Sequence, residues 1–216
     1  VHANIHFITV VGKEGDNYIV SDSYYPKLAK IHKDKLRKAR FAGGYMAPKG
    51  FMYYIESVPE QIDYNRLIPK AIKNTINNMI GVQPGFIGVK GIRLFSKKVQ
   101  KWPNLTRDTD HLSHEIMKIN VFLEDQGTGG GGFRYLYATF LRQASELLNS
   151  KELEDMSKKM MEIGDGWRKI SYFAAKIGKN RELGPEKLKT LGDMIMERAD
   201  AEEIFYKQLK QVISNF

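Results

Sequence analysis

The sequence predicts an α+β protein, in which a small antiparallel β-sheet is followed by a mostly α-helical domain of about five to six helices. Three observations predict this class. Residues 1–58 contain runs of β-branched and aromatic residues separated by turn residues. Pro59 then ends the β region. From residue 63 onward, apolar residues recur at i, i+3 and i+4, which is the spacing of amphipathic helices. We therefore expect two domains, residues 1–58 and 63–216.

Turn residues divide the β region into its elements. Strands are expected at 4–12, 17–25 and 50–57, with a short helix at about 32–40. The first two strands are joined across Lys13-Glu14-Gly15-Asp16, and two loops fit this turn. A four-residue loop would place His6 opposite Ser23. A three-residue loop would give Gly15 the left-handed position of a bulged turn and would place His6 directly opposite Asp22. We favour the three-residue loop.

Each expected helix shows an apolar face and a stop or start signal. Pro103 ends the second helix, Asp108 or Thr109 can cap the third, and Pro185 suits the first turn of the last. A glycine run precedes the fourth helix. The expected helices lie at about 63–79, 86–101, 109–125, 133–149, 151–178 and 185–214.

Composition excludes several classes of function. The 216 residues contain no cysteine, which excludes disulfides, thiolate metal sites and a thiol nucleophile within them. No apolar run reaches the roughly 18 residues that a membrane span needs, and no signal peptide is present, so a cytoplasmic protein is expected. The first residues already read as a core strand, which suggests that polypeptide precedes Val1 in the native protein.

The net charge of +9 favours acidic partners. The basic residues are too poor in interleaved aromatic residues to favour nucleic acid, and a solvated basic surface is the simplest alternative. A metal site is not expected. His2 and His6 would lie about 13 Å apart on a strand, and His111 and His114 have no third ligand at suitable spacing. The first basic cluster is Lys27, Lys30, Lys33, Lys35, Arg37, Lys38 and Arg40, and the second is Lys90, Arg93, Lys97, Lys98 and Lys101.

Three stretches resemble the butirosin biosynthesis protein H family. They are HFITVVG with VSD at 6–12 and 20–22, FIGVKGIRLFSKKVQKWP at 86–103, and EDQGTGGGGFRYLYATFL at 124–141. The resemblance implies that 1–58 is the C-terminal half of a papain-like domain, with the part that holds its cysteine absent, and that a helical domain of unknown function follows. The namesake member of the family moves an aminoacyl-type group from an acyl carrier protein to an amine of an aminoglycoside.

The resemblance implies acyl transfer from a carrier-protein thioester to a small-molecule amine acceptor. In that reading His6 is the general base and Asp22 fixes its tautomer, which are two of the three roles that a papain-like site needs. The nucleophile lies outside the chain, so the chain alone is expected to be inactive. No bound cofactor is implied beyond the phosphopantetheine arm of an acidic acyl carrier protein, for which Lys90, Arg93, Lys97 and Lys98 are candidate docking residues.

The glycine run opens onto a helix and can bring backbone N–H groups close to an anion. Arg134 in the first helical turn could clamp the same anion. A phosphopantetheine phosphate, a substrate carboxylate and this chain's own Glu124 all remain candidates, as does a flexible connector without a ligand. The candidate residues of the run are Gly127, Thr128, Gly129, Gly130, Gly131 and Gly132.

Other functions remain open. The chain could be a non-catalytic binding or assembly module, because it has no recognisable nucleophile, or part of a cysteine peptidase-like or amidase-like hydrolase. An exposed strand edge could also make it a homodimer. In the helical domain, the methionines Met156, Met160 and Met161 are expected to fill gaps in the core. Trp102 and Trp167 are expected to be anchors either of the core or of a domain interface.

Overall fold

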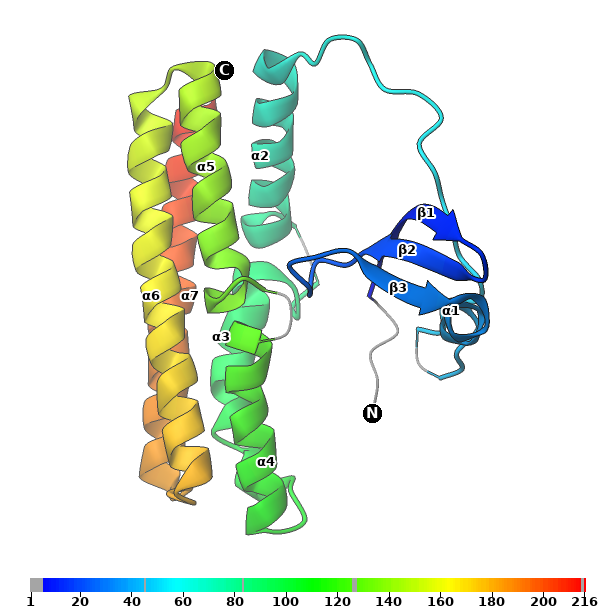
Figure 1. The fold of residues 1–216 in the computed structure, drawn as a ribbon. Helices are drawn as coiled ribbons and strands as arrows, with labels where there is room; N and C mark the ends of the chain where they lie inside the picture. Colours follow the sequence, from blue (N-terminus) through cyan, green and yellow to red (C-terminus); the bar gives the residue numbers. More distant parts are fainter. Residues whose placement is uncertain (1–5, 45, 83, 126–127, 215) are drawn as a thin grey trace. The chain divides into compact units, whose positions relative to one another are not determined.

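The computed structural model describes residues 6–44, 46–82, 84–125, 128–214 and 216 (Figure 1). The chain divides into two compact units, residues 1–60 and 61–216. Among the described residues, the first unit holds a three-stranded antiparallel sheet and one short helix, and the second consists of helices and the segments that connect them. The predicted α+β class is therefore confirmed.

The sheet of the first unit is a hairpin with one added strand. Strands β1 (Thr9–Glu14), β2 (Asn17–Ser21) and β3 (Ala29–His32) lie in the order β1-β2-β3, and every neighbour is antiparallel. Helix α1 (Lys33–Arg40) follows β3 directly and falls within the predicted range 32–40. The first hairpin differs from the prediction at both ends: at its open end the described strands reach only Thr9 and Ser21, and at its loop end β1 continues two residues farther than predicted, to Glu14.

The predicted three-residue loop between β1 and β2 is wrong. Glu14 pairs with Asn17, which leaves a two-residue loop, although Gly15 does have the left-handed φ of +56° that was expected. The register then shifts between Val10 and Gly12, because one extra residue in β1 forms a bulge. A bulge within β1 changes the count of paired residues, so loop length alone could not give the register farther along the strands.

The predicted strand at 50–57 is also wrong. The third strand is β3, which lies among the residues of the first basic cluster, between Lys27 and Arg40. Residues 50–57 form no strand. Aromatic and β-branched residues favour a strand because they pack against a half-buried pleated surface. In 51–58 these side chains are exposed, so that stabilising contact is missing.

The described residues of the second unit form six α-helices, as the periodicity of the sequence predicted. The short turns between them include a 3₁₀ turn at Trp102–Asn104, a π-helical turn at Val121–Asp125 that ends the predicted third helix, and a 3₁₀ turn at Gly131–Phe133. The helices are α2 (Tyr64–Ile80), α3 (Gly88–Val99), α4 (Thr109–Asn120), α5 (Arg134–Leu148), α6 (Lys151–Lys179) and α7 (Pro185–Ile213).

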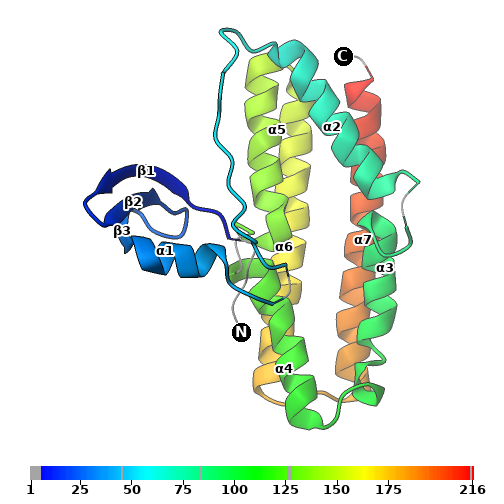
Figure 2. The ribbon, with the colours of Figure 1, turned by 90° about the vertical axis from the view of Figure 1, so that its right-hand side faces the viewer.

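Helices α6 and α7 form the centre of this unit. Each has 29 residues and is therefore about 43 Å long at 1.5 Å per residue. Two shorter helices follow one another along each long one: α5 and α4 along α6, and α2 and α3 along α7 (Figure 2). The result is a bundle of four columns, a geometry that buries one face of every helix.

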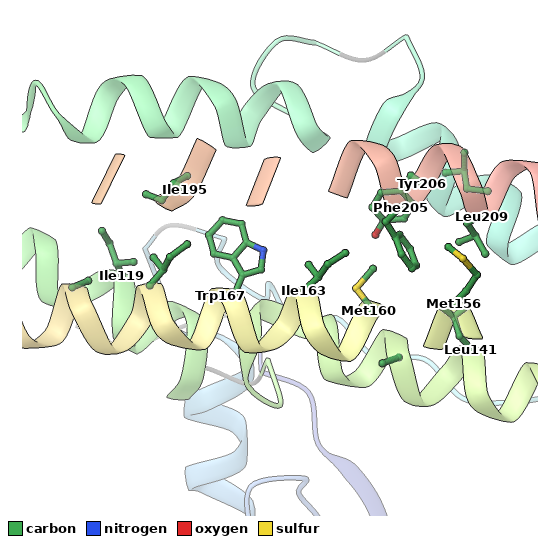
Figure 3. Close-up of a cluster of buried hydrophobic side chains, with 14 of the residues drawn as sticks. Ile119, Leu141, Met156, Met160, Ile163, Trp167, Ile195, Phe205, Tyr206 and Leu209 are labelled. Carbon is green, nitrogen blue, oxygen red and sulfur yellow. The ribbon is translucent and has the colours of Figure 1, made fainter. Parts of the chain in front are cut away.

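The core of the bundle lies between α6 and α7. Met156, Met160 and Trp167 of α6 face Ile195 and Phe205 of α7 (Figure 3). Trp167 and the first two methionines are buried as predicted, whereas Met161 is exposed. Buried serines add hydrogen bonds between helices: Ser96, Ser113 and Ser157 each donate to a carbonyl oxygen of a facing helix at 2.7–2.8 Å. In the described part of the chain, no helix is long and apolar enough to cross a membrane.

Candidate functional site

His6 and Asp22 meet in the first unit. The Nε2 atom of His6 lies 2.8 Å from Oδ1 of Asp22, so the predicted contact is present. It does not arise from the predicted register, because extending the Thr9–Ser21 pair by one residue would place Ile8, not His6, opposite Asp22. The two side chains meet just beyond the paired part of the strands.

A turn after β2 holds Asp22 in place. The backbone N–H of Tyr24 donates to the same Oδ1 at 2.9 Å, and the N–H of Tyr25 donates to the carbonyl oxygen of Asp22 at 3.0 Å. The Asp22 side chain is 15% exposed and that of His6 is 51% exposed. The Tyr24 N–H bond, and then His6, hold the pKa of the Asp22 carboxyl below its ordinary value. Asp22 therefore orients the imidazole of His6, which solvent and other groups can reach.

We expect the Asp22 carboxyl to titrate below its ordinary pKa of 3.8. Because its pKa is lowered in the folded unit, its contribution to stability is fully present above pH 3.8 and is lost as the pH falls through the folded-state pKa. Replacing the Tyr24 amide with an ester should raise this pKa more than His6→Ala does, since the amide bond is the larger cause. Carbon-13 NMR titration of the carboxyl measures both shifts, and a larger effect of His6→Ala would contradict the assignment.

The second candidate region is the glycine loop, residues 128–133 of the helical unit; Gly127 of the predicted set lies outside the described residues. Five consecutive residues have φ between +56° and +86°, a conformation that glycine alone adopts without steric cost. Phe133 is the one residue among them with a side chain, and it immediately precedes α5. Thr128 anchors the start of the loop through its hydroxyl, which donates to the carbonyl oxygen of Leu123 at 2.7 Å.

Glu124 of the same chain binds the glycine loop. Its Oε1 accepts the N–H of Gly131 at 3.3 Å, and its Oε2 accepts two N–H groups of Arg168 at 3.3 Å. The guanidinium of Arg168 in turn lies 4.5 Å from the ring centre of Tyr135. Glu124, the internal carboxylate among the anions considered from the sequence, therefore contacts this loop, and binding of an external anion there stays a prediction.

Arg134 binds a different carboxylate, Glu202 of α7. Its Nε and one terminal nitrogen donate to Oε1 of Glu202 at 3.0 and 2.7 Å, and its other terminal nitrogen donates to the carbonyl oxygen of Gly132 at 2.7 Å. The indole N–H of Trp167 donates to the same Oε1 at 2.6 Å. Arg134 therefore ties the glycine loop to α6 and α7, and a role in binding an external anion stays a prediction.

Glu202 is the residue that the sequence analysis missed. Its side chain is 0% exposed, and its Oε2 atom has no hydrogen-bond partner among the described residues. Burial, and then the negative charge of Glu202, raise the pKa of the nearby Tyr206 above its ordinary value, so that phenol keeps its proton. A signal was present in the sequence: Glu202 occupies the apolar stripe of its helix, four residues before Tyr206 and three after Ala199.

The predicted docking residues on α3 differ in their surroundings. Arg93 bridges Asp200 and Glu203 of α7, each at 2.6 Å, and its pKa is raised by these bonds. It serves the packing of α3 on α7 and is not a free surface charge. Lys90, Lys97 and Lys98 are exposed, and no ion pair joins them to the described residues. Docking of a carrier protein there stays a prediction.

Metal ligands do not gather in the described part of the chain. No group of three or more histidine or acidic side chains there could hold an ion. His111 lies 3.5 Å from Glu115, whose pKa is lowered chiefly by the Lys118 ammonium. His2 lies outside the described residues.

Residues 34–209 match a known family, described as "Domain of unknown function (DUF4872)". The chain belongs to this family. The match includes α1 and nearly all of the helical unit, with the glycine loop and the Arg134–Glu202 pair. No curated protein matches the chain. DUF4872 membership therefore covers the helical unit but not His6 or Asp22, which precede the matched residues.

Proposed function

We propose that residues 1–60 carry the general base and the orienting residue of a papain-like acyl-transfer site. The observation that carries this proposal is the 2.8 Å bond between Nε2 of His6 and Asp22. With Nε2 bonded to a carboxylate that a backbone N–H holds in place, Nδ1 is the nitrogen that can accept a proton. Among the described residues, His6 has no second hydrogen-bond partner that would occupy Nδ1.

The proposed reaction needs a thiol. Because the 216 residues contain no cysteine, the thiol belongs to polypeptide outside them, either joined to the chain or separate. His6 accepts the thiol proton, and the thiolate attacks the carrier thioester and displaces the carrier thiolate, which takes the proton from His6. An amine acceptor then attacks the new thioester, forming an amide and regenerating the thiol.

The exposed apolar surface of the first unit supports such a partner segment. Among the described residues up to 60, Val20 is the one buried hydrophobic side chain. An exposed surface of this kind marks a place where other protein packs. The side chains that would be covered include Phe7, Val10, Val11, Leu28, Phe51, Met52 and Tyr53, which are 49–70% exposed.

In the assembled enzyme, we expect His6→Ala to slow acyl transfer by about 10²–10⁴-fold, the usual contribution of a general base. The chain should be produced with the polypeptide that carries the thiol and supplied with a synthetic acyl thioester and an amine. Mass spectrometry of the thiol-bearing polypeptide measures the acyl-enzyme, and product analysis separates transfer to the amine from hydrolysis.

Two further variants sharpen this test. Asp22→Asn keeps an oxygen that accepts the imidazole N–H and should retain much of the activity, whereas Asp22→Ala removes the acceptor and should not. His114→Ala changes an exposed histidine of α4 and is the matched control. An acyl-transfer rate with His6→Ala equal to that of His114→Ala would contradict the proposal.

A further inference from the structure

A cavity of about 270 Å³ opens in the helical unit beside the π-helical turn. Its apolar walls come from α3, α4, α6 and the two short turns that follow α3 and α4. The cavity is large enough for a phenyl-sized group, and its volume lies just below the usual range of small-molecule sites. These walls are Phe95, Trp102, Ile119, Phe122, Leu123 and Trp167.

The cavity has a closed floor and an open mouth. Ile119 and Trp167 are 6% and 4% exposed, so they form the floor. Phe122, in the π-helical turn, is 57% exposed although it borders an apolar space. A π-helical turn adds a residue to a helix and is frequent at functional sites. Here it brings two neighbouring side chains, Phe122 and Leu123, to one cavity.

Both signs of charge lie at this mouth. Glu115 and Lys118, one turn apart on α4, line the cavity and bond to each other at 2.6 Å. Their side chains are 30% and 39% exposed, so both remain accessible to solvent. A ligand with only one charge would meet one opposite and one like charge at this point. A ligand that carries an ammonium and a carboxylate together would match both.

We propose that this cavity binds a zwitterionic small molecule with an aromatic or branched apolar end, of the chemical class of the hydrophobic α-amino acids. The apolar end occupies the space against Trp102 and Trp167. Its ammonium bonds to Glu115 and its carboxylate to Lys118. This site lies wholly within the helical unit and does not depend on the proposed role of His6.

The two tryptophans of the chain both line the cavity, so intrinsic fluorescence reports its occupancy. The full chain should be titrated with L-phenylalanine and with three matched probes. 3-Phenylpropionate lacks the ammonium, phenethylamine lacks the carboxylate, and L-alanine lacks the ring. We expect L-phenylalanine to bind at least about fivefold more tightly than 3-phenylpropionate or phenethylamine, the effect of one partly exposed charged contact. It should exceed L-alanine by at least about the same factor, because L-alanine has no ring to bury in the cavity.

Saturation-transfer NMR gives a second readout that does not depend on tryptophan. Lys118→Met and Glu115→Gln should each weaken L-phenylalanine binding about fivefold. Lys118→Met should also reduce the advantage of L-phenylalanine over phenethylamine, which lacks the carboxylate. Glu115→Gln should reduce its advantage over 3-phenylpropionate, which lacks the ammonium. Phe122→Ala should weaken it further, whereas Tyr172→Ala, which removes an exposed ring of α6 outside the cavity, should leave it unchanged.

Three results would overturn the proposal: no binding of L-phenylalanine by either method, equal binding of all four probes, or binding that Phe122→Ala leaves intact. Urea unfolding of each variant shows that a loss of binding is not a loss of fold.

Discussion

Replacing Arg134 with methionine should lower the free energy of unfolding of the helical unit by about 3–5 kcal/mol, the usual cost of removing one partner from a buried ion pair. Glu202 is 0% exposed, and Arg134 supplies two of its three hydrogen bonds. Methionine keeps most of the apolar stem but leaves a buried carboxylate that, among the described residues, has the indole N–H of Trp167 as its one donor. Urea unfolding followed by tryptophan fluorescence measures the loss, because both tryptophans lie in this unit.

A matched control lies on the same helix. Arg142 pairs with Glu146 at 2.7 Å, but both side chains are more than half exposed. Arg142→Met should therefore cost about 0.5 kcal/mol or less. The double variant Arg134→Met, Glu202→Gln should be more stable than Arg134→Met alone, because it removes the unpaired charge. Equal losses of unfolding free energy for Arg134→Met and Arg142→Met would show that breaking the buried pair costs no more than breaking the exposed one.

The helices could be predicted because each one carries its signal locally. The cap Asp108 and the prolines Pro103 and Pro185 lie within a few residues of the helix ends that they fix. The burial of Met160 likewise follows from spacing on a single helix. These features need no knowledge of distant residues, and they were predicted to within a few residues.

The sheet and the polar contacts depend on residues far apart in the sequence. The loop between β1 and β2 has two residues and not three, and one bulged residue in β1 shifts the register again, so the contact of His6 with Asp22 was predicted for a wrong reason. Arg134 and Glu202 are 68 residues apart, and periodicity cannot join them. A stricter reading of the apolar stripe would have identified Glu202 as a buried charge that needs a partner, but not which partner.

The glycine loop combines both kinds of information. The sequence indicated that the backbone of the run could approach an anion, and Glu124 was one of three candidate anions. The left-handed conformation at Gly131 can be predicted only in part from glycine itself, since a run of glycines is compatible with many paths. The path is selected by Glu124, by Arg134 and by the facing Gly164, whose Cα and carbonyl oxygen lie close to Gly131.

Substituting Gly131 with alanine should therefore destabilise the helical unit by about 2–5 kcal/mol. A residue with a Cβ pays about 1–2 kcal/mol for the left-handed conformation, here with φ of +56°. The new Cβ would also lie 3.1 Å from the ring of Tyr135 and 3.2 Å from the carbonyl oxygen of Gly164, which is tighter than ordinary contact. Overpacking of this kind costs about a further 1–3 kcal/mol. Urea unfolding measures the sum.

Two further variants separate the two costs. Gly15→Ala has the same φ of +56° with nothing within 4 Å of the new Cβ, so in the sheet unit it should show the conformational cost alone. Gly131→Asn tolerates the left-handed backbone better than alanine but keeps the Cβ. If crowding against Gly164 and Tyr135 fixes the loop, asparagine should recover only the smaller part of the loss. A full recovery with asparagine would mean that glycine is required here for its backbone conformation and not for the close approach of α6.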